Sequence, residues 1–429
     1  MDKFDVIVVG AGLAGSAAAL VAARAGLQTV LVERGSAPGT KTVSGGLLYG
    51  HALQRLVPNF WEEEPSPVER AIDRNVLALL TPTQAASIDF FDASFGKPPF
   101  NSFTVLRSKL DPWLAGKAEA AGTLPVYGAR VDSLVREQDR VIGIRAGDDE
   151  LRADVVVVAD GANALLTRPS GKEGEPDPSI VGVGVKEVLE LPTGEVERRF
   201  QLTGRSGTQY STIGFPENIE GGGFLYTNRD SISLGIILNL RGLAEHQVPM
   251  YDILEEYKQH PFLSRLVDGG TLREYSGCWV LEGGYDAVPP LFGAGYLVAG
   301  SAAGLFLNTG FTLRGMDFAL ESGRIAGETA VAAVHAKNAS PTFLGRYRAA
   351  LESSFVLKEL AHHRGYPSVF RNPRLYGTYP RLTNTVLRRM FFVDGSGRPH
   401  ARRVLSASAR GQVSMLGVLR DLYRASRVL

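Results

Sequence analysis

The start of the chain constrains its fold more than any other segment. An apolar run at residues 4–9 leads directly into Gly10-Ala11-Gly12-Leu13-Ala14-Gly15. In a strand that turns into a helix, Gly10 permits the tight turn, Gly12 lets the backbone approach a diphosphate, and Gly15 allows the helix to pack closely on the strand. The spacing therefore predicts a Rossmann-like dinucleotide-binding unit.

The residues after this turn complete the pattern. We expect a helix over residues 13–24, rich in alanine from Ala14 onward, whose unpaired amides and positive dipole end face the phosphates. A second apolar run at residues 28–33 ends in Glu33-Arg34. The Glu33 carboxylate is expected to accept hydrogen bonds from an adenosine ribose hydroxyl.

The cysteine content limits the redox chemistry that the chain can carry by itself. Cys278 is its single cysteine. An internal disulfide, an iron–sulfur cluster or a zinc site built from several thiolates is therefore excluded, and we predict no metal site. Any iron–sulfur centre must belong to a partner.

Length and hydropathy indicate a chain of ordinary globular composition. Its 429 residues, 44% of them hydrophobic, are enough for two or three domains. Residues 292–311 carry no charge and could span a bilayer by length alone, but five glycines favour a strand, a turn and a buried loop. Because only three residues precede the first strand, we expect no secretory signal and a cytoplasmic location.

The charge is divided unevenly along the chain. Residues 364–429 contain thirteen arginines, no lysine and two acidic residues, a net charge of +11, so residues 1–363 carry −10. Such a basic segment suits an anionic membrane surface, an acidic partner or its own acidic body. No nucleic-acid motif accompanies it, and we expect no nucleic-acid partner.

The order of predicted elements indicates an α/β fold with a β-rich insertion. Alternating strands and helices begin and end the first 336 residues, whereas strand-like runs dominate the middle. We expect a discontinuous dinucleotide-binding domain (1–72, 104–175 and 286–336), a β-rich substrate domain (73–103 and 176–285) and a basic C-terminal region (337–429).

Several motifs resemble a known family, the electron-transfer flavoprotein:quinone oxidoreductases, and in particular their FixC-type flavoprotein subunit. The motifs are the glycine turn with Glu33-Arg34, residues 41–48, VGVKEV at 183–188, GGGFLY at 221–226 and NTGFTLRGMD at 308–317. The resemblance extends from the start of the chain to about residue 327 and more loosely into the tail.

The resemblance implies that the dinucleotide is FAD. Its adenosine would lie at Glu33 and the backbone near Val131, its pyrophosphate at the glycine turn and Arg107, and its ribityl chain near Ser301, where many relatives have aspartate. Arg107 suits phosphate oxygens because its guanidinium is a planar fork; the plainer alternative is an exposed arginine at a helix start. The residues so assigned are Gly10, Gly12, Ala14, Gly15, Glu33, Arg34, Ser44, Gly45, Arg107, Val131, Asp160, Gly161, Ser301, Gly304, Gly315 and Met316.

The resemblance also implies a function. Electrons would arrive from an electron-transfer flavoprotein, with a small ferredoxin-like partner carrying any cluster, and would leave to a membrane quinone. We expect the quinone headgroup to bind near Gly221, Gly222 and Gly223, where backbone without side chains could approach a flat ring; the alternative is a glycine-rich hairpin turn. No acid, base or nucleophile is required, because the flavin itself accepts and donates the electrons. A helix that begins at Met316 would direct its positive end at the flavin.

Contact with the inner face of the cell membrane would be peripheral. The sequence Arg388-Arg389-Met390-Phe391-Phe392 and a possible helix over residues 413–429 combine cations with apolar side chains. Three other functions stay open: an isoprenoid double-bond reductase of the geranylgeranyl-reductase group, an aromatic hydroxylase, and a non-catalytic flavin subunit that conducts electrons within a complex.

Overall fold

A parallel sheet forms one half of the molecule. The computed structural model describes residues 3–40, 46–167, 176–395, 397 and 399–428. The strands of the first sheet run in the order β16-β17-β10-β1-β2-β7, and β8 and β9 extend it from β10. Strands β17, β10, β1, β2 and β7 are parallel. Their bounds are β1 Lys3–Val9, β2 Thr29–Glu33, β7 Leu124–Tyr127, β8 Ser133–Glu137, β9 Arg140–Ala146, β10 Asp149–Val158, β16 Phe292–Gly293 and β17 Tyr296–Val298.

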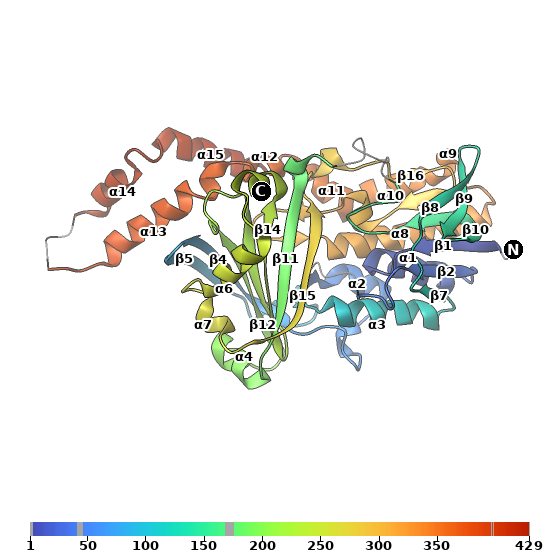
Figure 1. Cartoon of the computed structure of the whole chain (residues 1–429), viewed down its shortest axis with the longest axis horizontal. Helices are drawn as coiled ribbons and strands as arrows, with labels where there is room; N and C mark the ends of the chain where they lie inside the picture. Colours follow the sequence, from blue (N-terminus) through green and yellow to red (C-terminus); the bar gives the residue numbers. More distant parts are fainter. Residues whose placement is uncertain (1–2, 41–45, 168–175, 396, 398, 429) are drawn as a thin grey trace.

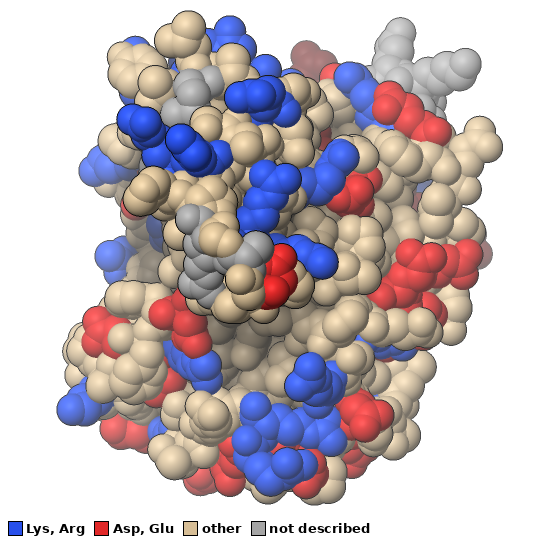
Figure 2. Space-filling view, turned by 90° about the vertical axis from the view of Figure 1, so that its left-hand side faces the viewer, with Lys and Arg blue, Asp and Glu red and all other residues tan. Residues whose placement is uncertain are grey.

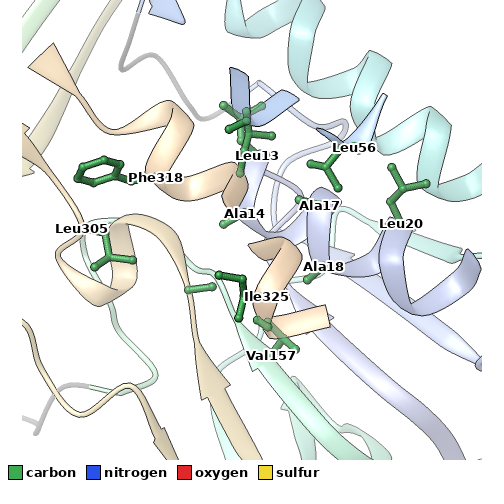
Figure 3. Packing of buried hydrophobic residues seen from close by; sticks show 14 of the residues in the cluster. Leu13, Ala14, Ala17, Ala18, Leu20, Leu56, Val157, Leu305, Phe318 and Ile325 are labelled. Carbon is green, nitrogen blue, oxygen red and sulfur yellow. The ribbon is translucent and has the colours of Figure 1, made fainter. Parts of the chain in front are cut away.

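Helices cover one face of this sheet. Helix α1 (Leu13–Arg24) and the long helix α8 (Met316–His335) pack together, with Gly323 and Gly327 of α8 against the backbone of Ala14 and Ala18 of α1. Figure 3 shows the buried hydrophobic residues around this contact. Helix α3 (Arg107–Ala120) lies beside α1. The other face packs against Val141 and Ile144 of β9 and the partly buried Leu134 of β8. Because both faces are covered, β1 and β10 end in continuous apolar runs, at residues 6–9 and 155–158.

A second sheet of nine strands forms the middle of the molecule (Figure 1). Its order is β15-β11-β14-β13-β12-β4-β6-β3, with β5 paired to β4. The bounds are β3 Leu47–Tyr49, β4 Ala71–Thr81, β5 Gln84–Phe91, β6 Ser102–Thr104, β11 Val181–Glu190, β12 Ser206–Ile213, β13 Gly221–Thr227, β14 Ser231–Asn239 and β15 Thr271–Leu281. Strand β3, inside the range 1–72 that we predict for the nucleotide domain, pairs with β6 in this second sheet.

One face of the second sheet is covered by short helices. Apolar residues of β11 and β14 pack there against Phe200 of α4 (Thr193–Phe200) and Tyr257 of α6 (Met250–Gln259). The other face is turned toward the first sheet. The helices are α2 Gly50–Leu56, α4 Thr193–Phe200, α5 Leu240–His246, α6 Met250–Gln259 and α7 Ser264–Val267, with 3₁₀ turns η1 Phe60–Glu62, η3 Pro178–Ile180, η4 Tyr285–Ala287 and η5 Gly300–Ala303 and the hairpin β18 Leu307–Asn308 and β19 Leu313–Arg314.

The C-terminal region is helical. Its elements are α9 Pro341–Leu344, α10 Arg346–Ser353, α11 Phe355–His362, α12 Tyr366–Phe370, η6 Pro373–Leu375, α13 Thr378–Phe391, α14 Ala401–Ala409 and α15 Met415–Val428. Helices α13 and α14 project at the end opposite the first sheet (Figure 1). Figure 2 faces this end and shows mostly Lys and Arg among the charged side chains of its upper part.

Most local expectations agree with the structure. The predicted helices at 13–24 and at Met316 have the observed bounds, and the uncharged stretch 292–311 forms β16, β17, η5 and β18 instead of a long helix. Over the described part of the chain, no helix has the length and apolar character needed to cross a membrane.

Candidate functional site

A cavity of about 350 Å³ is lined by residues of both sheets. The carboxyl ends of β1, β2 and β10 open into it, which is where open α/β sheets place their ligands. Thirteen of the residues predicted from the sequence line it: Gly10, Gly12, Ala14, Glu33, Arg34, Arg107, Val131, Asp160, Gly161, Ser301, Gly304, Gly315 and Met316. The predicted residues Ser44 and Gly45 lie outside the described residues.

The three glycines of the first turn have different surroundings. Gly10 has a φ of +98°, and a Cβ on it would lie 2.4 Å from the carbonyl oxygen of Ala159. A Cβ on Gly15 would lie 1.8 Å from the carbonyl oxygen of Gly10, so Gly15 serves the contact of helix and strand and does not line the cavity. A Cβ on Gly12 would point into open space, with only Arg107 Nη2 nearby at 3.6 Å. Gly12 therefore leaves room for a ligand.

Glu33 connects the glycine turn to the next loop. Its Oε2 accepts a hydrogen bond from the Ala11 amide at 3.0 Å, and its Oε1 accepts one from the Gly35 amide at 2.7 Å. These bonds hold the carboxylate at the edge of the cavity. Each carboxylate oxygen can accept a second hydrogen bond, so ribose hydroxyls remain possible donors.

Arg107 is a buried cation at the glycine turn. It begins α3, and its Nε and Nη2 donate to the two carboxylate oxygens of Asp111 at 2.5 and 2.7 Å. Asp111 is fully buried one helical turn later. This bidentate pair fixes the direction of the guanidinium. Sequence reasoning missed Asp111, although the i, i+4 spacing of opposite charges on a predicted helix was an available signal.

A turn after β10 forms another wall. Asp160 Oδ2 accepts a hydrogen bond from the Leu166 amide at 3.1 Å, and Gly161 has a φ of +86°. The carbonyl of the preceding Ala159 is the group that excludes a side chain at Gly10. The two predicted turns, far apart in sequence, are therefore in direct contact.

The N-terminal end of α8 completes this half of the cavity. Gly315 precedes the helix, and Gly315, Met316 and Ala319 line the cavity. The Gly300 amide donates to Ser322 Oγ at 3.0 Å, which ties the exposed Ser301 to α8. An oriented N-terminus of a 20-residue helix favours negative charge nearby.

The second sheet supplies an aromatic and glycine-rich wall that sequence reasoning did not identify. Phe224 and Tyr226 of β13 are stacked with centroids 5.0 Å apart. Gly184 of β11 lies opposite Cys278 of β15, and Lys186 lies opposite Ser276. These four residues and Trp279 line the cavity. Burial raises the pKa of the Cys278 thiol and lowers that of Lys186.

The glycines predicted to bind quinone are placed differently. Gly221, Gly222 and Gly223 begin β13 and are not among the residues that line the cavity. A Cβ on Gly222 would lie 2.3 Å from the carbonyl oxygen of Thr212, and one on Gly223 would lie 2.3 Å from the ring of Tyr257. Close packing within the domain therefore explains why glycine stands at Gly222 and Gly223. Along β13 the first residue that lines the cavity is Phe224.

The residues present fit an extended flavin dinucleotide. Gly12 and the Arg107 guanidinium suit a diphosphate, Glu33 suits a ribose, and the glycine and aromatic wall suits a flat ring. No group of three His, Cys, Asp or Glu residues within the described chain could hold a metal ion.

Comparisons with known proteins agree with this geometry. The family model for FAD-dependent oxidoreductases matches residues 5–168, that for the ubiquinone-binding part of ETF-QO matches residues 181–279, and that for the C-terminal domain of the ETF-QO/FixC family matches residues 366–429.

Relatives match along the whole chain. The probable electron transfer flavoprotein-quinone oxidoreductase YdiS of Escherichia coli (strain K12) is 43% identical over 100% of this chain and 99% of that protein. Protein FixC of the same strain is 40% identical over the same shares. The solved structure of a geranylgeranyl bacteriochlorophyll reductase-like protein from Thermoplasma acidophilum has a TM-score of 0.72 at 17% identity, covers 99% of this chain and 100% of that one, and shows the shared fold. The chain is an FAD-dependent oxidoreductase and belongs to the ETF-QO/FixC family.

Proposed function

We propose that the chain takes electrons from an electron-transfer flavoprotein and passes them through FAD to a membrane quinone. One observation carries this proposal. The half of the cavity opposite the dinucleotide turn is formed by Gly184, Lys186, Phe224, Tyr226 and residues 276–279, which all fall inside the 181–279 stretch matched by the ubiquinone-binding family model.

The residues of the first half would hold the cofactor. In this proposal Glu33 binds the ribose, and Gly12 with Arg107 binds the diphosphate. Bound FAD supplies reversible acceptance of electrons, so the side chains need only bind, orient and exclude water. The N-terminal end of α8 would favour the negative charge that reduction brings to the ring.

The second half would admit a flat ring. Phe224 and Tyr226 offer a stacked aromatic surface, and Gly184 adds no side chain to the cavity wall on β11. Trp279 lines the cavity and is 42% exposed, so an apolar molecule entering there would meet an aromatic side chain at the rim. The quinone headgroup would then lie against β11 and β15 and not at Gly221–Gly223.

Electron transfer itself is the test. Purified chain should be yellow, should be reduced by a reduced electron-transfer flavoprotein, and should be reoxidised by a soluble quinone analogue. Reoxidation by quinone in the isolated chain identifies a catalyst. Reduction without quinone-dependent reoxidation would instead favour a flavin subunit that only conducts electrons inside a complex.

We also propose that the C-terminal helices place the chain peripherally on the inner face of the membrane. Phe391 and Phe392 at the end of α13 are 80% and 61% exposed, and arginines of α13 to α15 accompany them. Exposed apolar side chains next to cations suit an anionic lipid surface. A ferredoxin-like partner with its own cluster could contact the same basic region.

Vesicle binding tests the membrane contact. The flavin-loaded chain should cosediment with vesicles containing anionic lipid in low salt, and Phe391→Asp/Phe392→Asp should reduce this at least several-fold. Substituting the exposed Leu124, at the opposite end of the molecule, by Asp is the matched control. Equal cosedimentation of all three proteins, or none by the unaltered chain, would contradict the membrane contact.

A further inference from the structure

Lys186 carries a buried positive charge on the cavity side of β11. A Cβ on Gly184, two residues earlier, would lie 3.6 Å from Cys278 Sγ and 3.4 Å from Ile237 Cγ1, and both of these residues line the cavity. Side chains two apart in a strand lie on the same face. The Lys186 side chain, in a residue only 4% exposed, therefore lies on the cavity face.

The protein does not satisfy this charge with a hydrogen bond. The closest carboxylate atom, Glu274 Oε1, is 3.9 Å from Lys186 Nζ, and no described residue accepts a hydrogen bond from it. The neighbouring Glu187, on the opposite face of the strand, is paired with Lys258 at 2.9 Å. A buried ammonium without an acceptor is unfavourable unless a ligand provides one.

A second polar group lies beside Lys186. Ser276 of β15 is directly opposite Lys186 in the antiparallel ladder, and it also lines the cavity. Its hydroxyl is buried and has no hydrogen-bond partner among the described residues. Directly opposite side chains in such a ladder have Cβ atoms about 5 Å apart. One bound acceptor could thus contact both groups.

The surroundings favour a flat ligand. Gly184 lies two residues before Lys186 in β11, and Gly235 of β14 lies opposite Lys186 on the other side. The Phe224 ring covers Gly235, since a Cβ there would be 2.4 Å from Phe224 Cζ. The face of a planar ring would contact the strand backbone and the aromatic carbons of Phe224. The polar edge of the ring would contact Lys186 and Ser276.

We propose that Lys186, assisted by Ser276, binds a carbonyl oxygen of a planar conjugated ring that gains negative charge when the ring is reduced. Two rings offer such an oxygen: the isoalloxazine of FAD, and a quinone, which rests on the proposed function. An ammonium hydrogen bond strengthens as charge on the oxygen grows, so Lys186 stabilises the reduced ring more than the oxidised one. No bond forms or breaks at Lys186.

Three variants of the full chain test the proposal. Lys186→Met removes the charge at similar volume, and Lys186→Arg keeps it. Lys258→Met is the control because Lys258, a lysine of α6, pairs with Glu187 on the opposite face of β11. Each is measured for FAD content, the midpoint potential of bound flavin, and KM and kcat with a soluble quinone analogue. Thermal unfolding of the FAD-free proteins shows whether each variant folds.

The outcome identifies the source of the oxygen. If it belongs to flavin, Lys186→Met should bind reduced flavin at least about ten-fold more weakly relative to oxidised flavin, which lowers the midpoint potential by ~30 mV for a two-electron couple. If it belongs to quinone, kcat/KM should fall about ten-fold or more, with kcat lowered, while the flavin potential stays constant. Lys186→Arg should recover part of the lost potential or part of the lost quinone activity. Lys258→Met should change neither the flavin potential nor the quinone kinetics.

Two results would overturn the proposal. One is a folded Lys186→Met flavoprotein with unchanged potential and unchanged quinone kinetics. The other is a Lys186→Met chain that does not fold without FAD, because removal of an unpaired buried cation should not destabilise the empty protein. Failure of the proposed function would be seen separately, because the unaltered chain would then not reduce quinone. The midpoint potential of bound flavin in Lys186→Met would still test the role of Lys186.

Discussion

The backbone of Gly323 in α8 lies directly against the carbonyl oxygen of Ala14 in α1. A Cβ on Gly323 would come within 2.1 Å of this oxygen, closer than packed atoms allow. Ala14 follows the glycine turn and lines the cavity, and α8 begins at the other end of the same cavity. The helix contact therefore sets the spacing between the two helix N-termini that face the ligand.

We predict that Gly323→Ala separates α1 from α8 and lowers both stability and FAD affinity. Overpacking of this kind costs typically 1–3 kcal/mol, and more where backbone must move. Gly327→Ala, with its closest contact at 2.8 Å, should cost less. Gly116→Ala in α3 has no atom within 4 Å and should be neutral or stabilise by about 0.5–1 kcal/mol. Urea unfolding and flavin titration measure both effects; equal stability of all three variants would contradict the packing argument.

Gly12 and Gly15 should respond differently to alanine. Gly15→Ala brings a Cβ within 1.8 Å of the Gly10 carbonyl, so we expect poor folding even without FAD. Gly12→Ala meets only Arg107 Nη2 at 3.6 Å, so the empty chain should keep its thermal stability while FAD binding falls at least ten-fold, because the methyl group occupies the space of the diphosphate. Full flavin content in Gly12→Ala would show that the diphosphate lies elsewhere.

Variants of Arg107 and Asp111 can distinguish the effect of this ion pair on the free energy of unfolding from its effect on FAD affinity. Asp111→Ala leaves a buried guanidinium without its carboxylate and should cost about 3–5 kcal/mol. The double variant Arg107→Met/Asp111→Leu removes both charges and should recover most of that loss, but its FAD affinity should stay low because no guanidinium faces the phosphates. Denaturant unfolding of the empty proteins and flavin titration give the two quantities. If the double variant binds FAD as tightly as the unaltered chain, then Arg107 does not bind the diphosphate.

Local sequence patterns predicted the first half of the cavity. Gly10, Gly12, Glu33 and Met316 lie at ends of strands or helices that short-range patterns identify, and the parallel sheet brings those ends together. Asp111 was within reach of the same reasoning through its spacing from Arg107.

The second half depends on register between distant strands. Lys186 lies beside Ser276 only because β11 pairs with β15 across ninety residues, and no local pattern specifies that pairing. Gly221–Gly223 were assigned to quinone because a glycine in a strand can mark the close approach of a ligand. It can equally mark close packing by protein, here by Thr212 and Tyr257, and the sequence does not distinguish the two.

Two half-buried carboxyl groups should make stability depend on pH. Burial raises the pKa of Glu220 and of Glu282 to about 7, and the charge of Glu220 adds to the shift at Glu282. Nearby Arg371 and Arg241 oppose the shift at Glu220, and a hydrogen bond to Asn308 opposes it at Glu282.

The sign of the pH effect follows from proton binding. An unfolded glutamate has a pKa of about 4.3, so between that pH and about 7 the folded chain binds more protons than the unfolded chain. The free energy of unfolding should therefore fall as pH rises through this range, and these groups should cause no further change above it.

The Glu282→Gln side chain stays neutral at every pH. The variant should therefore be as stable as the unaltered chain near pH 4.5 and more stable at pH 8, and its stability should change less between these pH values. Glu220→Gln should remove its own share and part of that of Glu282, because the two titrations are coupled. Urea unfolding at pH 4.5, 6 and 8 measures these slopes, and a Glu282→Gln protein less stable than the unaltered chain at pH 8 would show that the carboxylate is held ionised in the fold.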